Sequence, residues 1–91
     1  MAVISAALDS AGETTSAVVV DRGQMFMFSV SGTFVATWNV QFKAQGESAF
    51  TNLGKDYTTQ ETKTGVSAVR GSYRITMSAR TSGAADVKLY T

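Results

Sequence analysis

The sequence predicts an all-β fold, a small antiparallel β-sandwich or a jelly-roll-like barrel, formed by a single domain of 91 residues. Three observations predict it. Apolar and polar residues alternate with a period of two, as in strands that bury one face. Turn residues recur at roughly 8–12-residue intervals, a spacing typical of sandwiches and barrels. Proline is absent, serine and threonine are abundant, and the helix formers Glu, Lys and Leu are scarce.

The first fifteen residues are mostly small and polar, and two interpretations of them stay open. Residues 1–15 form either a flexible N-terminal arm or a short strand around Val3–Leu8. Residues 16–91 are expected to hold the β-sandwich itself. This part begins with the β-branched run Ser16–Val20, which ends at a turn-like Asp21-Arg22-Gly23.

Two long alternating stretches follow. In Gln24–Ser31, two phenylalanines and a valine share one face, while Met25 and Met27 share the other. This pattern indicates a strand that the core covers on one side and that something else covers in part on the other. Thr33–Lys43 is the clearest strand of the chain, because five apolar residues alternate there with polar or smaller ones.

The rest of the chain predicts shorter elements. Turns are expected at Gly46-Glu47 and Asn52–Asp56, and a surface loop or edge strand at Thr58–Lys63. Ser72–Arg80 and Ala85–Thr91 alternate cleanly on either side of Thr81-Ser82-Gly83, which predicts an antiparallel hairpin. The expected core residues are Phe26, Phe28, Val30, Phe34, Trp38, Val40, Phe42, Tyr73, Ile75, Met77, Val87 and Leu89.

The composition limits the chemistry that this chain can perform. It has no cysteine and no histidine, which excludes disulfides, zinc sites of the usual kind and the common nucleophile–base pairs. The carboxylates fall in turns or at outward strand positions, where no paired acid and base is expected. No phosphate-binding glycine loop or EF-hand spacing occurs. We therefore expect no catalytic residue, no metal and no cofactor, and predict that the protein is not an enzyme.

Charge and hydropathy argue against two further classes of partner. The net charge is +1, so no strong field attracts nucleic acid or an anionic membrane. No apolar run reaches the roughly 18 residues that a membrane-spanning helix needs. Residues 1–5 lack the basic and apolar regions of a signal peptide. We expect neither a nucleic acid nor a membrane as partner.

Five residues are candidate partner contacts: Arg70, Arg74, Arg80, Tyr57 and Tyr90. Arg74 and Arg80, which have Thr76 and Ser78 between them, are expected on one face of a strand. There the two arginines would meet phosphates or acidic side chains of a partner. The alternative is an ordinary solvated face whose charges oppose aggregation. The two tyrosines are the candidates for exposed aromatic contacts, whereas Trp38 is expected in the core.

Two segments resemble small virion proteins of tailed phages: Ser31–Gln41, with the pattern Ser-Gly-Thr-Phe followed by a strand, and Tyr73–Val87, with Tyr-Arg, a strand, Thr-Ser-Gly and a further strand. The resemblance covers about residues 28–90. That family usually has an Asp-Gly-Gly-x-x-Trp turn after the first long strand. Here Ala44–Phe50 takes its place, with Phe50 where the tryptophan would be.

The resemblance implies a structural protein of the phage particle. The leading expectation is a capsid cement or decoration protein that binds and stabilises the outer capsid surface as a homo-oligomer, with the major capsid protein as partner. Such a protein is made in the host cytoplasm and resides on the virion. The alternative is a receptor- or carbohydrate-binding module associated with a tail or fibre.

Overall fold

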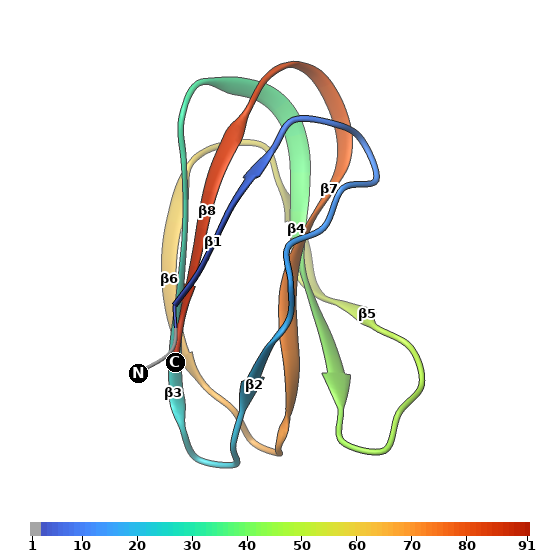
Figure 1. Cartoon of the computed structure of the whole chain (residues 1–91), viewed down its shortest axis with the longest axis vertical. Coiled ribbons are helices and arrows are strands. Elements are labelled where there is room, and N and C mark those ends of the chain that lie inside the picture. Colours follow the sequence, from blue (N-terminus) through green and yellow to red (C-terminus); the bar gives the residue numbers. More distant parts are fainter. Residues whose placement is uncertain (1–2) are drawn as a thin grey trace.

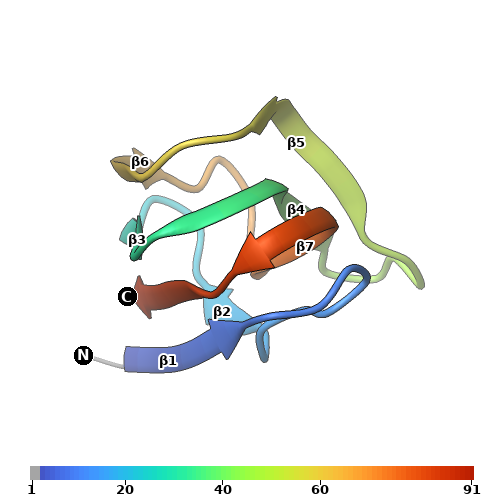
Figure 2. The same ribbon diagram turned by 90° about the horizontal axis from the view of Figure 1, so that it is seen from above.

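Eight strands form two four-stranded antiparallel sheets that pack face to face, in a computed structural model that describes residues 3–91 (Figures 1 and 2). The strands are β1 (Val3–Leu8), β2 (Val18–Val20), β3 (Met25–Ser31), β4 (Phe34–Ala44), β5 (Thr51–Tyr57), β6 (Glu61–Val66), β7 (Gly71–Gly83) and β8 (Ala85–Tyr90). Sheet A has the order β1-β8-β3-β6, and sheet B has the order β2-β7-β4-β5. The predicted all-β sandwich is confirmed.

The strand pairs are nested. β1 pairs with β8, β2 with β7, β3 with β6 and β4 with β5, all antiparallel. This is the pairing of one long hairpin, with its tip between β4 and β5, that has been rolled up so that β3 also pairs with β8 and β4 with β7. Eight strands in two such sheets define a jelly roll. The jelly-roll alternative of the sequence analysis therefore describes the topology.

The core lies between the two sheets and is built from the inward residues of alternating strands. Trp38, Ile75 and Met77 of sheet B are fully buried, and they face Val30, Val87 and other apolar residues of sheet A. The expected core residues are all buried except Phe26, Phe34 and Phe42, which are partly buried and pack against the same cluster. The sequence analysis missed four core residues: Leu8, Val18, Val20 and Ala85.

From residue 3 onwards, the N-terminal segment belongs to the sandwich. Of the two interpretations, the strand is the one that the structure has: β1 runs along β8, and Leu8 is only 1% exposed. Residues 9–15 continue along the edge of sheet B, where the amide of Thr15 donates to the carbonyl of Ile75 and the amide of Met77 donates to that of Glu13. The domain thus begins before residue 16.

The predicted hairpin of Ser72–Arg80 with Ala85–Thr91 is wrong. The turn near Gly83 carries the chain from β7 in sheet B to β8 in sheet A, as Figure 2 shows, so the two strands face each other across the core. The predicted turn at Asn52–Asp56 is also wrong, because these residues lie within β5. The pairing of β5 with β4 shifts register there, which places Gly54 with its positive φ in a bulge.

Candidate functional site

The outer face of sheet B gathers cationic side chains at one end. Cross-strand partners share a face of a sheet, so the register identifies which residues lie there. Val19 of β2, Ser72 of β7 and Lys43 of β4 form one outward row. The next row contains Arg74 of β7 and Gln41 of β4, followed by Asn52 of β5. Two cations therefore project from neighbouring rows of the same surface.

Gln41 fixes the position of Arg74. Its side-chain oxygen accepts hydrogen bonds from Nε of Arg74 at 2.7 Å and from the hydroxyl of Thr76 at 2.9 Å. Its amide nitrogen donates to the side-chain oxygen of Asn52 at 3.1 Å. Gln41 thus ties three strands together on the outer face. The bond to Gln41 uses only Nε of the guanidinium. Its two terminal nitrogens have no hydrogen bond to another described residue, so they can receive a partner group.

Phe50 lies under the cations. The guanidinium carbon of Arg74 is 3.9 Å from the centre of the Phe50 ring, and Nζ of Lys43 is 5.2 Å from it. Both distances are within the range of cation–π attraction. Among residues 3–91, the two ion pairs are Arg70–Asp21 and Lys63–Glu61. Lys43 and Arg74 are thus balanced by an aromatic ring rather than by a carboxylate. We call Gln41, Lys43, Phe50 and Arg74 the basic face.

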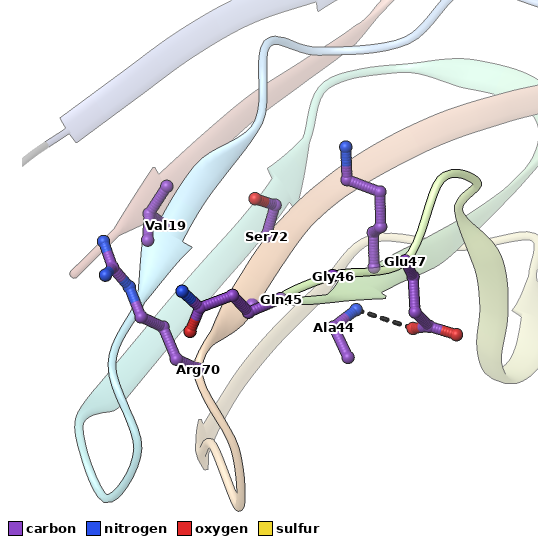
Figure 3. A pocket seen from close by; sticks show the side chains of 9 residues that line it. Val19, Ala44, Gln45, Gly46, Glu47, Arg70 and Ser72 are labelled. Carbon is purple, nitrogen blue, oxygen red and sulfur yellow. Dashed lines mark hydrogen bonds between the residues drawn. The ribbon is translucent and has the colours of Figure 1, made fainter.

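A hollow of about 270 Å³ adjoins the basic face (Figure 3). Sheet B contributes Val19, Ser72, Lys43 and Ala44, and the turn after β4 contributes Gln45, Gly46 and Glu47. Figure 3 shows Glu47 on the turn, with its carboxylate accepting a hydrogen bond from the amide of Ala44 at 2.7 Å. This bond holds the turn in place. Since the hollow is open and small, it fits one side chain of a partner better than an enclosed small molecule.

The structure separates the three predicted arginines. Arg70 also lines the hollow, and it pairs with Asp21 at 3.1 Å. Arg74 and Arg80 do not share a face, contrary to the prediction. The register of β4 and β7 shifts near Ser78, so that Arg80 stands opposite Ala36, which packs against the core, while Arg74 stands opposite Gln41. One extra residue in a strand reverses the faces of the residues that follow it up to the next register shift, which lies here between Ala36 and Val35.

Neither predicted tyrosine is fully exposed. Tyr57 stacks on Trp38 with ring centres 4.5 Å apart and 18° between their planes, which covers one of its ring faces. Lys55 and Lys63 each lie about 5–6 Å from the same ring. Tyr90 lies on the outer face of sheet A, opposite Met27, far in the fold from the basic face. The five predicted contacts therefore do not form one site.

Sequence reasoning missed three members of the basic face: Gln41, Lys43 and Phe50. The signal for two of them is present in the sequence, since Gln41 and Lys43 are among the polar residues that alternate with the apolar ones in Thr33–Lys43. The meeting of Phe50 with Arg74 depends on the long β4–β5 turn, whose path is not visible in the sequence. In the part of the chain that the structure describes, no group of acidic side chains could hold a metal ion, and no helix is long and apolar enough to cross a membrane.

The chain was compared with protein-family models, with curated proteins and with solved structures, and none of the three comparisons gave a match.

Proposed function

We propose that this protein is a non-enzymatic structural protein of a phage virion, most directly a capsid cement or decoration protein that binds the outer shell as an oligomer. The single observation that carries the proposal is the basic face, with Lys43 and Arg74 held over Phe50. Cations fixed in this way are suited to acidic side chains on a protein surface. The resemblance of residues 28–90 to tailed-phage virion proteins gives the partner its class, the major capsid protein.

The physical design of the fold supports such a role. A jelly roll of this size presents two sheet surfaces that no other described element covers, and it holds them rigidly on a shared core (Figure 2). Each exposed charge pair contributes little by itself, typically below about 1 kcal/mol. On a capsid, many copies repeat the same weak contacts, and linked contacts bind much more tightly than single ones. A small surface without a deep pocket is therefore sufficient for this function.

The second candidate, a carbohydrate- or receptor-binding module of a tail, has weaker support. Sugar recognition commonly uses an aromatic ring with an open face beside hydrogen-bonding groups. Tyr57 keeps one ring face against Trp38, and the lysines Lys55 and Lys63 approach the ring. A screen against a glycan array distinguishes the two functions: specific glycan hits that Tyr57→Ala abolishes would favour the module.

The direct test of the capsid proposal uses purified particles of the phage that encodes the chain. Mass spectrometry should find the protein in many copies per particle, and electron microscopy should place it on the outer shell. Particles that lack it should lose infectivity at a lower temperature or under chelator or osmotic stress. Absence of the protein from purified particles, together with unchanged resistance, would overturn the proposal.

The basic face has a matched test. The double variant Lys43→Gln/Arg74→Gln removes its two cations, and Arg22→Gln/Lys55→Gln removes two exposed cations elsewhere. Added to particles that lack the protein, the first variant should bind at least about tenfold more weakly at physiological salt, and the control should bind like the unaltered chain. Equal binding by both variants would show that the basic face is not the contact surface.

A further inference from the structure

The outer face of sheet A is the second uncovered surface of the molecule. The register places Val3, Tyr90, Met27 and Thr64 in one row across all four strands. The adjacent row contains Met25 of β3 opposite Val66 of β6. In Figure 2, sheet A lies on the outside of the sandwich, and no other described strand packs over it. The apolar ends of both rows therefore meet solvent.

These residues form an apolar patch of unusual exposure. Met25 is 65% exposed, Val66 61% and Val3 51%, and they are neighbours of the half-buried Met27 and Tyr90. A depression of about 450 Å³ runs between Met25, Met27, Thr64 and Tyr90. Single exposed apolar residues are ordinary, whereas a contiguous patch marks a binding surface. We call Val3, Met25, Met27, Val66 and Tyr90 the apolar patch.

Charge on this face is sparse and balanced. At the outward positions of the four described strands, the charged residues are Asp86 and Lys88, one of each sign, both on β8. On β3, Ser31 and Ser29 stand directly beside them. The face is therefore neutral as a whole. A second copy of the same face can approach it without net electrostatic repulsion.

We propose that the outer face of sheet A is a self-association surface, and that its occupant is the same face of a second copy. The pair is isologous, with its two-fold axis parallel to the strands and between β8 and β3, the centre of the sheet order. Under this symmetry, Tyr90 of one copy meets Met27 of the other, which gives two sulfur–aromatic contacts and leaves Met25 and Val66 at the rim of the contact. Lys88 meets Ser29, and Asp86 meets Ser31, so no like charges face each other. Each charged group gains a hydroxyl partner.

The size of the face sets the expected strength. Four strands about 4.8 Å apart and about six residues long cover roughly 400 Å² in projection. A standard stable interface buries about 800 Å² per partner. The pair is therefore weak in dilute solution, with a dissociation constant between about 10 µM and 1 mM. Neighbouring copies on a shell would reach such concentrations locally. The inference rests on the proposed function only for this last point.

Sedimentation equilibrium of the purified full chain, from about 1 µM to about 1 mM, tests the proposal. We expect a concentration-dependent monomer–dimer equilibrium. Met27→Glu should raise the dissociation constant at least about tenfold. The matched control is Val35→Glu, which adds a carboxylate at a 59%-exposed apolar position of sheet B and should leave the equilibrium unchanged. A monomer at about 1 mM, or equal effects of the two variants, would overturn the proposal.

Cross-linking tests the geometry, because the chain has no cysteine of its own. A Ser29→Cys copy mixed with a Lys88→Cys copy should form a mixed dimer with a short bismaleimide that spans the roughly 10 Å between packed sheets. Ser78→Cys on sheet B should not. Preferential dimers through Ser78→Cys would refute the assignment. Binding to particles separates this proposal from the proposed function. If the Met27→Glu protein stays monomeric but still binds single sites on the particle, capsid binding through the basic face stands without self-association. If the unaltered chain dimerises but binds no particle, only the capsid role is overturned.

Discussion

Replacing Trp38 with phenylalanine should lower the free energy of unfolding by about 2–3 kcal/mol. The indole is fully buried, and its Nε1 donates to the carbonyl of Thr59 at 3.0 Å. Loss of that donor removes a hydrogen bond worth about 1 kcal/mol and leaves the carbonyl with one partner fewer. The smaller ring also leaves a cavity beside Tyr57 and Phe28, whose ring centres lie 4.5 and 5.9 Å from that of the indole. This cavity should cost about 1–2 kcal/mol more.

Urea unfolding followed by far-ultraviolet circular dichroism measures this change, since the substitution removes the single tryptophan. The midpoint should fall while the dependence on urea stays the same, and the melting temperature should drop by about 10–20 °C. Tyr90→Phe serves as the control, because its hydroxyl lies on the outer face, and should cost less than about 0.5 kcal/mol. A loss below about 0.5 kcal/mol for Trp38→Phe would refute the packing that joins the β5–β6 connection to the core.

Two further predictions concern backbone contacts. Gly83→Ala should destabilise the fold by several kcal/mol or prevent folding, because the φ of Gly83 is +80° and an added Cβ would lie 2.2 Å from the carbonyl oxygen of Thr33. Gly46→Ala is the control. The φ of Gly46 is +93° but open space surrounds it, so this substitution should cost only about 1 kcal/mol. Similar melting temperatures for the two would contradict this. Thr15→Val should cost about 1–3 kcal/mol in urea unfolding, since the buried hydroxyl accepts from the amide of Ile75 at 3.1 Å, whereas the exposed neighbour Thr14→Val should be near neutral.

The parts of the fold that sequence alone predicts are those governed by local alternation. The rows around Trp38 and Ile75 follow from a period of two, and both residues are fully buried. Leu8 was not predicted as a core residue, because its burial depends on the pairing of β1 with β8, at the other end of the chain. Nothing local distinguishes an arm from an edge strand when the partner is about eighty residues away. The same reason explains the wrong hairpin, since a Thr-Ser-Gly turn serves a crossing between sheets as well as a reversal.

The candidate site was predictable only in part, because its geometry depends on bulges. Arg74 was identified correctly as an outward residue, but the extra residue near Ser78 moves Arg80 to the opposite side of the strand. A bulge has no distinctive sequence signature here. The sequence shows Phe50 as an aromatic residue in the turn after the long strand, yet its position under Arg74 depends on the path of that turn. Such errors fall where strand pairing is irregular, and those positions also shape the surface.

The rolled-hairpin topology has a consequence for how the two proposed surfaces work together. Figure 2 shows the two sheets as the two layers of the sandwich. Since the basic face belongs to the outer face of sheet B and the apolar patch to that of sheet A, they point in opposite directions. A copy that holds a partner through sheet B therefore keeps sheet A free for a second copy, and neither contact blocks the other. Among residues 3–91, the hydrogen-bond and ring partners of the basic face include no residue of the apolar patch, so the effects of substitutions on the two surfaces should add. The Lys43→Gln/Arg74→Gln variant should accordingly dimerise like the unaltered chain, and a change in its dimerisation constant would show that the two surfaces are coupled through the core.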